Sequence, residues 1–298
     1  MLATQMLPQE RLLLQEPMSR HTSWRVGGPA ERFFQPLDLA DLCSYLRQSP
    51  NMEPPSLWIG LGSNLLVRDG GIPGLVVCLA GRLTSIQTMD GGDLRVESGV
   101  TCARLARYCA DAGLAGGEFF AGIPGSLGGA LAMNAGAHDG STWEQVVAVE
   151  TIDRQGVIRI RMPHEFAVNY RSVTGPAEEW FVAAHLRMIS GTRELIREQM
   201  REILRWRKRH QPLDLPSAGS VFRNPPGDHA ARLIDSAGLK GLREGGAAVS
   251  EKHANFIVND GTATAADIEA LIESVRDQVR QVHGVELEKE VHIVGVAR

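Results

Sequence analysis

This chain of 298 residues is 43% hydrophobic and 22% charged, which is the composition of a globular protein and argues against a disordered, collagenous or coiled-coil one. Its length predicts roughly two domains. The formal net charge of −4 offers no bulk electrostatic attraction to nucleic acid or to an anionic membrane, so we expect neither as a partner.

The first 190 residues alternate short apolar runs with turn signals, which predicts many short strands. Two helices are expected, at 37–46 and at 102–112, and Gly113 is placed to end the second one. Glycine-containing turns at 90–92 and 154–156 predict two hairpins. The predicted strands are 32–34, 56–60, 74–79, 83–89, 93–98, 146–152, 157–161 and 180–189.

A change in composition follows, and we place a domain boundary within or just after a polar amphipathic helix at 192–210. The apolar residues predicted to face inward on this helix are Leu195, Ile196, Met200, Ile203 and Leu204. The remaining chain predicts strands at 220–222, 256–258 and 286–294, and a short helix at 230–237. A last helix has an apolar face from Ile268 to Val282, and Thr264 with Asp267 resembles a capping box at its start. The class is therefore mixed α and β.

The cysteines and the apolar runs bear on the cell compartment. Four cysteines form no CxxC pair and no zinc spacing, so we expect reduced, packed thiols in a cytoplasmic protein. The N-terminus lacks a basic region followed by a long apolar run, so no signal peptide is expected. The longest uncharged run, 119–138, contains five glycines and Pro124, which argues against a membrane span.

Glycine is the unusual residue, because 18 of the 32 glycines lie between Gly60 and Gly140. The sequence has no complete GxGxxG, Walker A or GxSxG motif there. Two glycine loops remain, at 60–66 and at 121–137. Bare, consecutive N–H groups form anion-binding concavities, so the two loops can hold a diphosphate cofactor. The alternative is that both are tight turns of a turn-rich β domain.

Seven collinear motifs in this chain resemble those of the UDP-N-acetylenolpyruvoylglucosamine reductases. They run from about residue 20 to 295 in the family's order, and no single one would suffice. The motifs are 21–30 (HTSWRVGGPA), 60–66 (GLGSNLL), 121–136 (AGIPGSLGGALAMNAG), 170–171 (YR), 217–225 (SAGSVFRNP), 245–247 with 249–256 (GGA, VSEKHANF) and 287–291 (LEKEV).

The resemblance implies an α+β fold, with a two-lobed FAD-binding module of the vanillyl-alcohol-oxidase (PCMH) type and a C-terminal α+β substrate-binding domain. It places the FAD module at 20–192, with lobes of about 20–80 and 81–192, and the substrate domain at 205–298. The short segment between Arg171 and Ser220 is similar to the family's shorter subtype. The implied FAD-binding residues are Gly60, Gly62, Ser63, Asn64, Leu65, Gly122, Ile123, Pro124, Gly125, Ser126, Gly128, Gly129, Asn134, Ala135 and Gly136.

The implied reaction passes hydride from NADPH to FAD and then to C3 of the enolpyruvyl group of a UDP-sugar, giving UDP-N-acetylmuramate for peptidoglycan. Arg171 is implied as the group that pairs with the substrate carboxylate, for which a guanidinium offers a bidentate fork. Ser220 is implied as the proton donor to C2, and Glu290 as the acid that orients the enol. Tyr170 and Asn224 are implied substrate ligands, and no metal is expected.

Some alternatives stay open on the sequence alone. The family often has Tyr-Arg-x-Ser, whereas here Ser172 follows Arg171 directly, which puts a role for that serine in doubt. Another FAD oxidoreductase with a different substrate, or a flavin- or nucleotide-binding protein without turnover, would also carry the glycine loops. His21, His138 and His229 have no metal-site spacing and are treated as ordinary. A preference for NADPH over NADH and the oligomeric state are not predicted.

Overall fold

The computed structural model describes residues 11–48, 55–138 and 140–298. The chain divides into two compact units, each built from separate segments. Unit 1 takes in the described residues of Met1–Leu14, Arg32–Leu61 and Gly74–Arg205. Unit 2 takes in Gln15–Glu31, Gly62–Pro73 and Trp206–Arg298. These units are defined by packing, and the ligand-binding domains expected at 20–192 and 205–298 stay a prediction.

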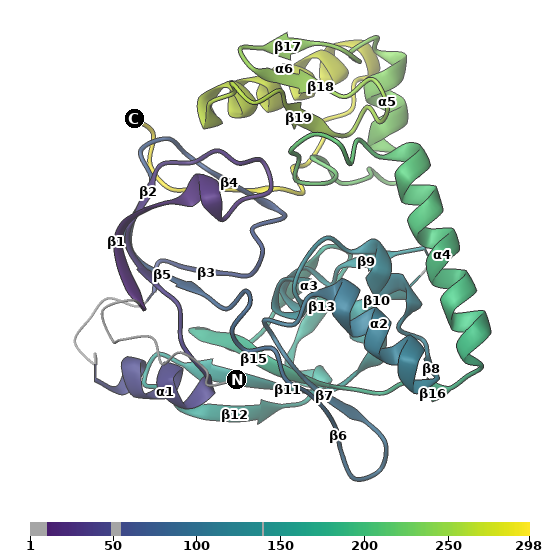
Figure 1. The fold of residues 1–298 in the computed structure, drawn as a ribbon. Coiled ribbons are helices and arrows are strands. Elements are labelled where there is room, and N and C mark those ends of the chain that lie inside the picture. The colour runs from purple at the N-terminus through teal and green to yellow at the C-terminus, as the bar shows by residue number, and fades with distance from the viewer. Residues whose placement is uncertain (1–10, 49–54, 139) are drawn as a thin grey trace. The chain divides into compact units, whose positions relative to one another are not determined.

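The main feature of unit 1 is a five-stranded antiparallel sheet with the order β12-β11-β15-β7-β6 (Figure 1). The strands are β6 (Ile86–Thr88), β7 (Leu94–Glu97), β11 (Val146–Asp153), β12 (Ile158–Arg161) and β15 (Glu179–Leu186). Both predicted hairpins are therefore confirmed. Helices α2 (Cys102–Ala112) and α3 (Leu127–Met133) pack with apolar side chains of this sheet, in a core that includes Leu94, Val149 and Leu186. Gly113 ends α2 with φ 72°, as predicted.

A second core of unit 1 lies under helix α1 (Leu39–Arg47), whose Leu42, Cys43 and Leu46 are buried. Asp38 caps this helix by accepting a 2.8 Å hydrogen bond from the N–H of Asp41. Strand β3 (Leu57–Ile59) pairs in parallel with β5 (Ile72–Cys78), in a four-stranded sheet of order β1-β2-β5-β3. The other two strands are β1 (Leu12–Pro17) and β2 (Pro29–Phe34).

Short elements connect these layers and carry most of the functional loops. Before Met133 they are η2 (Met18–Arg20), β4 (Leu65–Val67), β8 (Leu114–Ala115) and η3 (Glu118–Gly122). After it they are β9 (Gly136–Ala137), β10 (Gly140–Ser141), η4 (Thr142–Gln145), η5 (Pro163–Glu165), β13 (Ala167–Asn169), β14 (Ser172–Thr174) and β16 (Ile189–Ser190). The predicted helix at 192–210 is present as α4 (Arg193–His210), which is 18 residues long.

Unit 2 is built on a small antiparallel sheet against which one long helix packs. The sheet has the order β17-β18-β19, and α6 (Ala265–His283) contacts all three strands (Figure 1). The predicted capping box of Thr264 and Asp267 is present at the start of α6. The other elements are α5 (Ala230–Ser236), β17 (Arg243–Glu244), β18 (Ala247–Val249), β19 (Ile257–Asn259) and β20 (His292–Val294), which pairs in parallel with β4.

Some sequence expectations were wrong. The segment 220–222 is no strand and forms only an isolated bridge between Phe222 and Lys289, and strand 286–294 shortens to β20. Leu195 and Leu204 are exposed on α4, and Val282 is exposed at the end of α6. Periodicity identifies an apolar stripe, but whether another element covers each position depends on tertiary packing.

Two general expectations can be compared with the structure. All four cysteines are buried and free, as predicted. Among the residues that the structure describes, no helix is long and apolar enough to cross a membrane.

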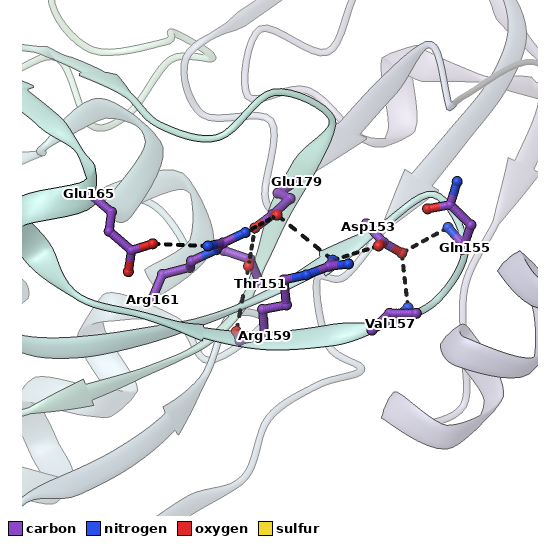
Figure 2. Close-up of polar contacts among 8 residues, drawn as sticks. All are labelled: Thr151, Asp153, Gln155, Val157, Arg159, Arg161, Glu165 and Glu179. Atoms are coloured by element: carbon purple, nitrogen blue, oxygen red, sulfur yellow. Dashed lines mark hydrogen bonds and ion pairs between the residues drawn. The ribbon is translucent and has the colours of Figure 1, made fainter.

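A dense polar network joins three strands at the β12 edge of the five-stranded sheet (Figure 2). Glu179 has a side chain only 8% exposed and accepts hydrogen bonds from Arg161 at 2.5 and 3.0 Å and from the Thr151 hydroxyl at 2.6 Å. These bonds, those from Arg161 first, hold the pKa of Glu179 below its usual value although burial opposes the shift. Arg159 of β12 donates to Asp153, the last residue of β11, and so extends the network toward the turn between these strands.

Glu179→Gln is expected to destabilise the protein by about 1–3 kcal/mol at pH 7, because it replaces a charged acceptor with a neutral one and leaves Arg161 partly unpaired. Since the folded-state pKa is lowered, the contribution is fully present above the unfolded pKa of about 4.3 and is lost as pH falls through the folded value. Urea unfolding of the wild type and the variant at several pH values measures this contribution to the free energy of unfolding. Glu178→Gln, at an exposed neighbour 3.8 Å from Arg154, should change stability by less than about 0.5 kcal/mol. A difference that persists unchanged below the folded pKa would contradict the assignment.

Candidate functional site

The first residue of the 60–66 glycine loop lies against the second glycine loop within unit 1. A Cβ built on Gly60 would lie 2.0 Å from the Oγ of Ser126, so Gly60 must be bare for the second loop to approach it. Ser126 is 2% exposed, and its hydroxyl does not cap helix α3. Residues about sixty positions apart in the sequence thus form one small-residue surface.

The second loop is anchored by backbone hydrogen bonds to the end of β7 and the start of α2. The N–H groups of Leu127 and Gly128 donate to the carbonyls of Val100 and Ser98, and the N–H of Cys102 donates to Gly125. A Cβ built on Gly128 would lie 3.0 Å from the Cβ of Ser98, whereas one on Gly129 would meet nothing nearer than the Ser126 Oγ at 4.0 Å. Gly129 is exposed, so no packing within the protein requires a glycine there. The open backbone at this position is compatible with the predicted diphosphate-bearing cofactor.

The rest of the first loop belongs to unit 2, because the division between the units falls after Leu61. Gly62 has φ 60°, and a Cβ there would lie 2.0 Å from the carbonyl of His21. Asn64 also contacts the segment that carries Glu290. Its Nδ2 donates to the backbone carbonyl of Glu290 at 3.0 Å, and its backbone carbonyl accepts from the N–H of His292. A predicted cofactor residue thus holds the backbone of a predicted catalytic one.

An open pocket of about 270 Å³ lies in unit 1 and brings several predicted residues together. It is lined by Asn134, Gly136, Ala137, His138, Gly140, Ser141, Glu144, Tyr170 and Arg171. Three of these, Asn134, His138 and Arg171, have positive φ angles of 40°, 49° and 55°. Only six non-glycine residues in the described parts of the chain adopt such a conformation. Left-handed backbone at residues other than glycine is more frequent at functional sites than elsewhere, so its clustering makes this pocket a candidate functional site.

Arg171 lies in the two-residue turn between β13 and β14. Its guanidinium donates to the carbonyls of Gly136 at 3.0 Å and Asn134 at 3.4 Å, and its Cζ is 5.0 Å from the centroid of the Tyr170 ring. A Cβ on Gly136 would fall 2.5 Å from the carbonyl of Gly140 and 3.4 Å from the Arg171 Nη1. The glycine therefore permits the close approach of the Gly140 carbonyl, which pairs β9 with β10 beside the arginine.

Ser220 and Glu290 lie in neighbouring segments of unit 2. The N–H of Glu290 donates to the carbonyl of Val221 at 2.8 Å, directly after Ser220. Both side chains are partly exposed, and Gly219 has φ 76° at the turn before Ser220. Arg171 belongs to unit 1, so the structure brings together Ser220 with Glu290, and separately Arg171 with Tyr170, Asn134 and Gly136.

Comparison with known proteins decides the family. A model described as an FAD binding domain matches residues 30–161, and one for the C-terminal domain of UDP-N-acetylenolpyruvoylglucosamine reductase matches 211–294. The reductase of Alkalilimnicola ehrlichii is 60% identical over 95% of this chain and 94% of its own. That of Legionella pneumophila (strain Corby) is 52% identical over 97% and 94%. The crystal structure of the reductase (MurB) from Thermus caldophilus superposes with a TM-score of 0.82 at 35% identity, over 95% of this chain and 98% of that one.

The chain belongs to the UDP-N-acetylenolpyruvoylglucosamine reductase family. As such it is an FAD-dependent oxidoreductase that acts on UDP-N-acetylenolpyruvoylglucosamine in peptidoglycan synthesis. The predicted α+β fold, with an FAD-binding module of the PCMH type followed by a separate C-terminal domain, is confirmed. The roles of individual residues in this reductase stay predictions.

Several residues of the reductase were missed by the sequence analysis. Asn255 is 3% exposed, and its side chain both accepts from the N–H and donates to the carbonyl of Phe222, at 3.0 and 2.8 Å. It thereby fixes the segment that follows Ser220. Glu144 and His138 line the Arg171 pocket, although His138 was treated as ordinary. The positive φ of His138 is not visible in its sequence context, and only the buried position of Asn255 distinguishes it from a surface amide.

Asn224, a predicted substrate ligand, is exposed and already has one structural partner. Its Oδ1 accepts a 3.1 Å hydrogen bond from the N–H of Ala230, which opens α5. The amide therefore has a helix-capping role. The second lone pair of Oδ1 and the Nδ2 donors are left for the predicted substrate contact.

Gly129→Ala is expected to separate folding from FAD binding. The alanine fits the protein and is better in a helix, so the apoprotein should gain about 0.5–1 kcal/mol. Because Gly129 is a predicted FAD-binding residue, the same methyl group is expected to obstruct the cofactor, and the dissociation constant for FAD should rise tenfold or more, about 1.4 kcal/mol. Urea unfolding of the apoprotein and titration with FAD measure the two effects. Ala112→Gly in α2 is the matched control, which should lose stability and keep its FAD affinity. Unchanged FAD affinity in Gly129→Ala would remove Gly129 from the cofactor site.

Proposed function

We propose that this reductase uses NADPH as its reductant and that Arg171, Ser220 and Glu290 carry the reduction of the enolpyruvyl group. When bound at the predicted glycine loops, FAD would supply the redox chemistry, linking oxidation of NADPH to reduction of the substrate at C3. The protein must then manage the negative charge that develops on C2 and its carboxylate, and must deliver one proton to C2. Hydride at C3 and a proton at C2 together convert the carbon–carbon double bond into a single bond.

Arg171 is proposed to bind the substrate carboxylate. A guanidinium keeps its charge at every working pH and offers a planar fork that matches a carboxylate. Its location in the strained pocket, where two backbone carbonyls fix the guanidinium, is the observation that carries this part of the proposal. Because these hydrogen bonds exist before substrate arrives, little reorganisation is needed when charge develops. Tyr170, which is 54% exposed beside it, is proposed to contact the substrate.

Ser220 is proposed to donate the proton to C2, and Glu290 to orient the enol. A neutral hydroxyl is a weak acid, so it serves only when it is held within hydrogen-bond reach of a strongly basic carbon. Asn255 and the backbone of Glu290 fix the residues that follow Ser220, which supports a held rather than a mobile hydroxyl.

We also propose that the protein is located in the cytoplasm. The four cysteines of the chain are buried and free, as expected in a reducing compartment.

The test follows the two half-reactions separately under anaerobic conditions. The purified protein should be yellow, with the absorption of oxidised flavin near about 450 nm. NADPH should bleach that band, and UDP-N-acetylenolpyruvoylglucosamine should restore it. A protein that NADPH reduces but this substrate does not re-oxidise would contradict the proposal, and a flavin band that NADPH does not bleach would contradict the choice of reductant.

A further inference from the structure

The side chain of Asn134 links three segments that surround Arg171. Its Nδ2 donates to the carbonyl of Asn169 at 3.3 Å, and its Oδ1 accepts from the N–H of Trp143 at 3.1 Å. Asn169 is the last residue of β13, one position before the Tyr170-Arg171 turn, and Trp143 belongs to η4. One amide thus holds the base of the turn and a neighbouring wall of the pocket.

The backbone of Asn134 acts on the same arginine. Its carbonyl accepts from the Arg171 Nη1, and two residues further on Gly136 accepts from Nη2. The intervening Ala135 is fixed because its carbonyl accepts hydrogen bonds from both the N–H and the hydroxyl of Thr142, at 3.0 and 2.7 Å. The guanidinium therefore lies against a segment whose own position is set by η4.

The residue type at position 134 has three requirements. Asn134 ends α3 with φ 40° and ψ 52°, a left-handed conformation that asparagine and glycine adopt most readily. It must also donate one hydrogen bond and accept another. Glycine would satisfy only the backbone requirement, and aspartate would lose the hydrogen-bond donor. Alanine would meet none of the three requirements.

We propose that Asn134 is a positioning residue that aims Arg171 at the substrate carboxylate, by joining the turn that carries the arginine to the carbonyls that hold its guanidinium. The inference rests on the proposed function of Arg171. It assigns Asn134, implied by the family resemblance as a cofactor residue, to the substrate half-reaction.

The experiment is a double-mutant cycle on re-oxidation of the reduced holoenzyme by UDP-N-acetylenolpyruvoylglucosamine. Asn134→Gly keeps the left-handed backbone and removes both side-chain hydrogen bonds, so it should slow re-oxidation about 10- to 100-fold. In an Arg171→Ala background the same change should have less than about a twofold effect, because its target is gone. FAD content, the flavin spectrum and reduction by NADPH should stay as in the wild type. Glu178→Gly, at another left-handed residue of unit 1, is the matched control and should leave both half-reactions unchanged.

The outcomes distinguish the two levels of the proposal. Additive effects of Asn134→Gly and Arg171→Ala would overturn the positioning role and leave the proposed function intact. A lowered FAD content or an altered flavin spectrum in Asn134→Gly would overturn it as well, by assigning Asn134 to the cofactor. Re-oxidation that is unaffected by Arg171→Ala would instead refute the role of Arg171 itself. Asn134→Asp, which keeps the acceptor for Trp143 and loses the donor to Asn169, should also slow re-oxidation, and wild-type behaviour would count against the proposal.

Discussion

Ser220→Ala is expected to leave reduction of the flavin by NADPH near the wild-type rate and to slow re-oxidation by substrate about 10²- to 10⁴-fold, the usual value of a positioned general acid. The hydroxyl is needed only when a proton is delivered to C2, which occurs after hydride transfer to the flavin is complete. Stopped-flow absorbance of the flavin under anaerobic conditions measures both rates on one sample.

Ser217→Ala is the matched control, because Ser217 lies three residues earlier and pairs through its backbone with Val258. It should keep both rates. Loss of both half-reactions in Ser220→Ala would indicate damage to the site rather than loss of a proton donor. Full retention of re-oxidation would show that another group delivers the proton.

Replacing Arg171 by alanine or by glycine should slow the reaction equally but give proteins of different stability. Arg171→Ala and Arg171→Gly both remove the guanidinium, and each should slow re-oxidation about 10²- to 10³-fold, as for the loss of a charge-stabilising donor. They differ in the backbone. Because position 171 has φ 55°, glycine should make the protein about 1–2 kcal/mol more stable than alanine does. Urea unfolding of the two variants gives this difference directly.

Glu178 offers the comparison for that experiment, since it has the same φ of 55° in the same unit but does not line the pocket. Glu178→Gly should likewise be more stable than Glu178→Ala, with wild-type activity in both. Equal stability of Arg171→Gly and Arg171→Ala would mean that the turn holds no backbone strain. Strain at Arg171 would then no longer support the pocket as a functional site.

Local patterns predicted many of the elements. The hairpins at 90–92 and 154–156, the end of α2 at Gly113 and the capping box of α6 each depend on a few neighbouring residues, and all are present. The segment 220–222 was predicted as a strand but forms only one isolated bridge, and the predicted strand 286–294 is limited to β20. The side chain of Asn255, more than thirty residues away from Phe222, takes the place of a partner strand.

The sequence by itself determined the family, the FAD-binding module and the identity of the candidate catalytic residues, because these depend on motifs whose residues are close together in the chain. The tertiary structure alone decided how those residues are held. The approach of Gly60 to Ser126, the holding of the Arg171 guanidinium by the carbonyls of Asn134 and Gly136, and the fixing of Phe222 by Asn255 arise from contacts between distant segments. Such contacts leave no local signal, since glycine or asparagine is equally suited to an ordinary turn.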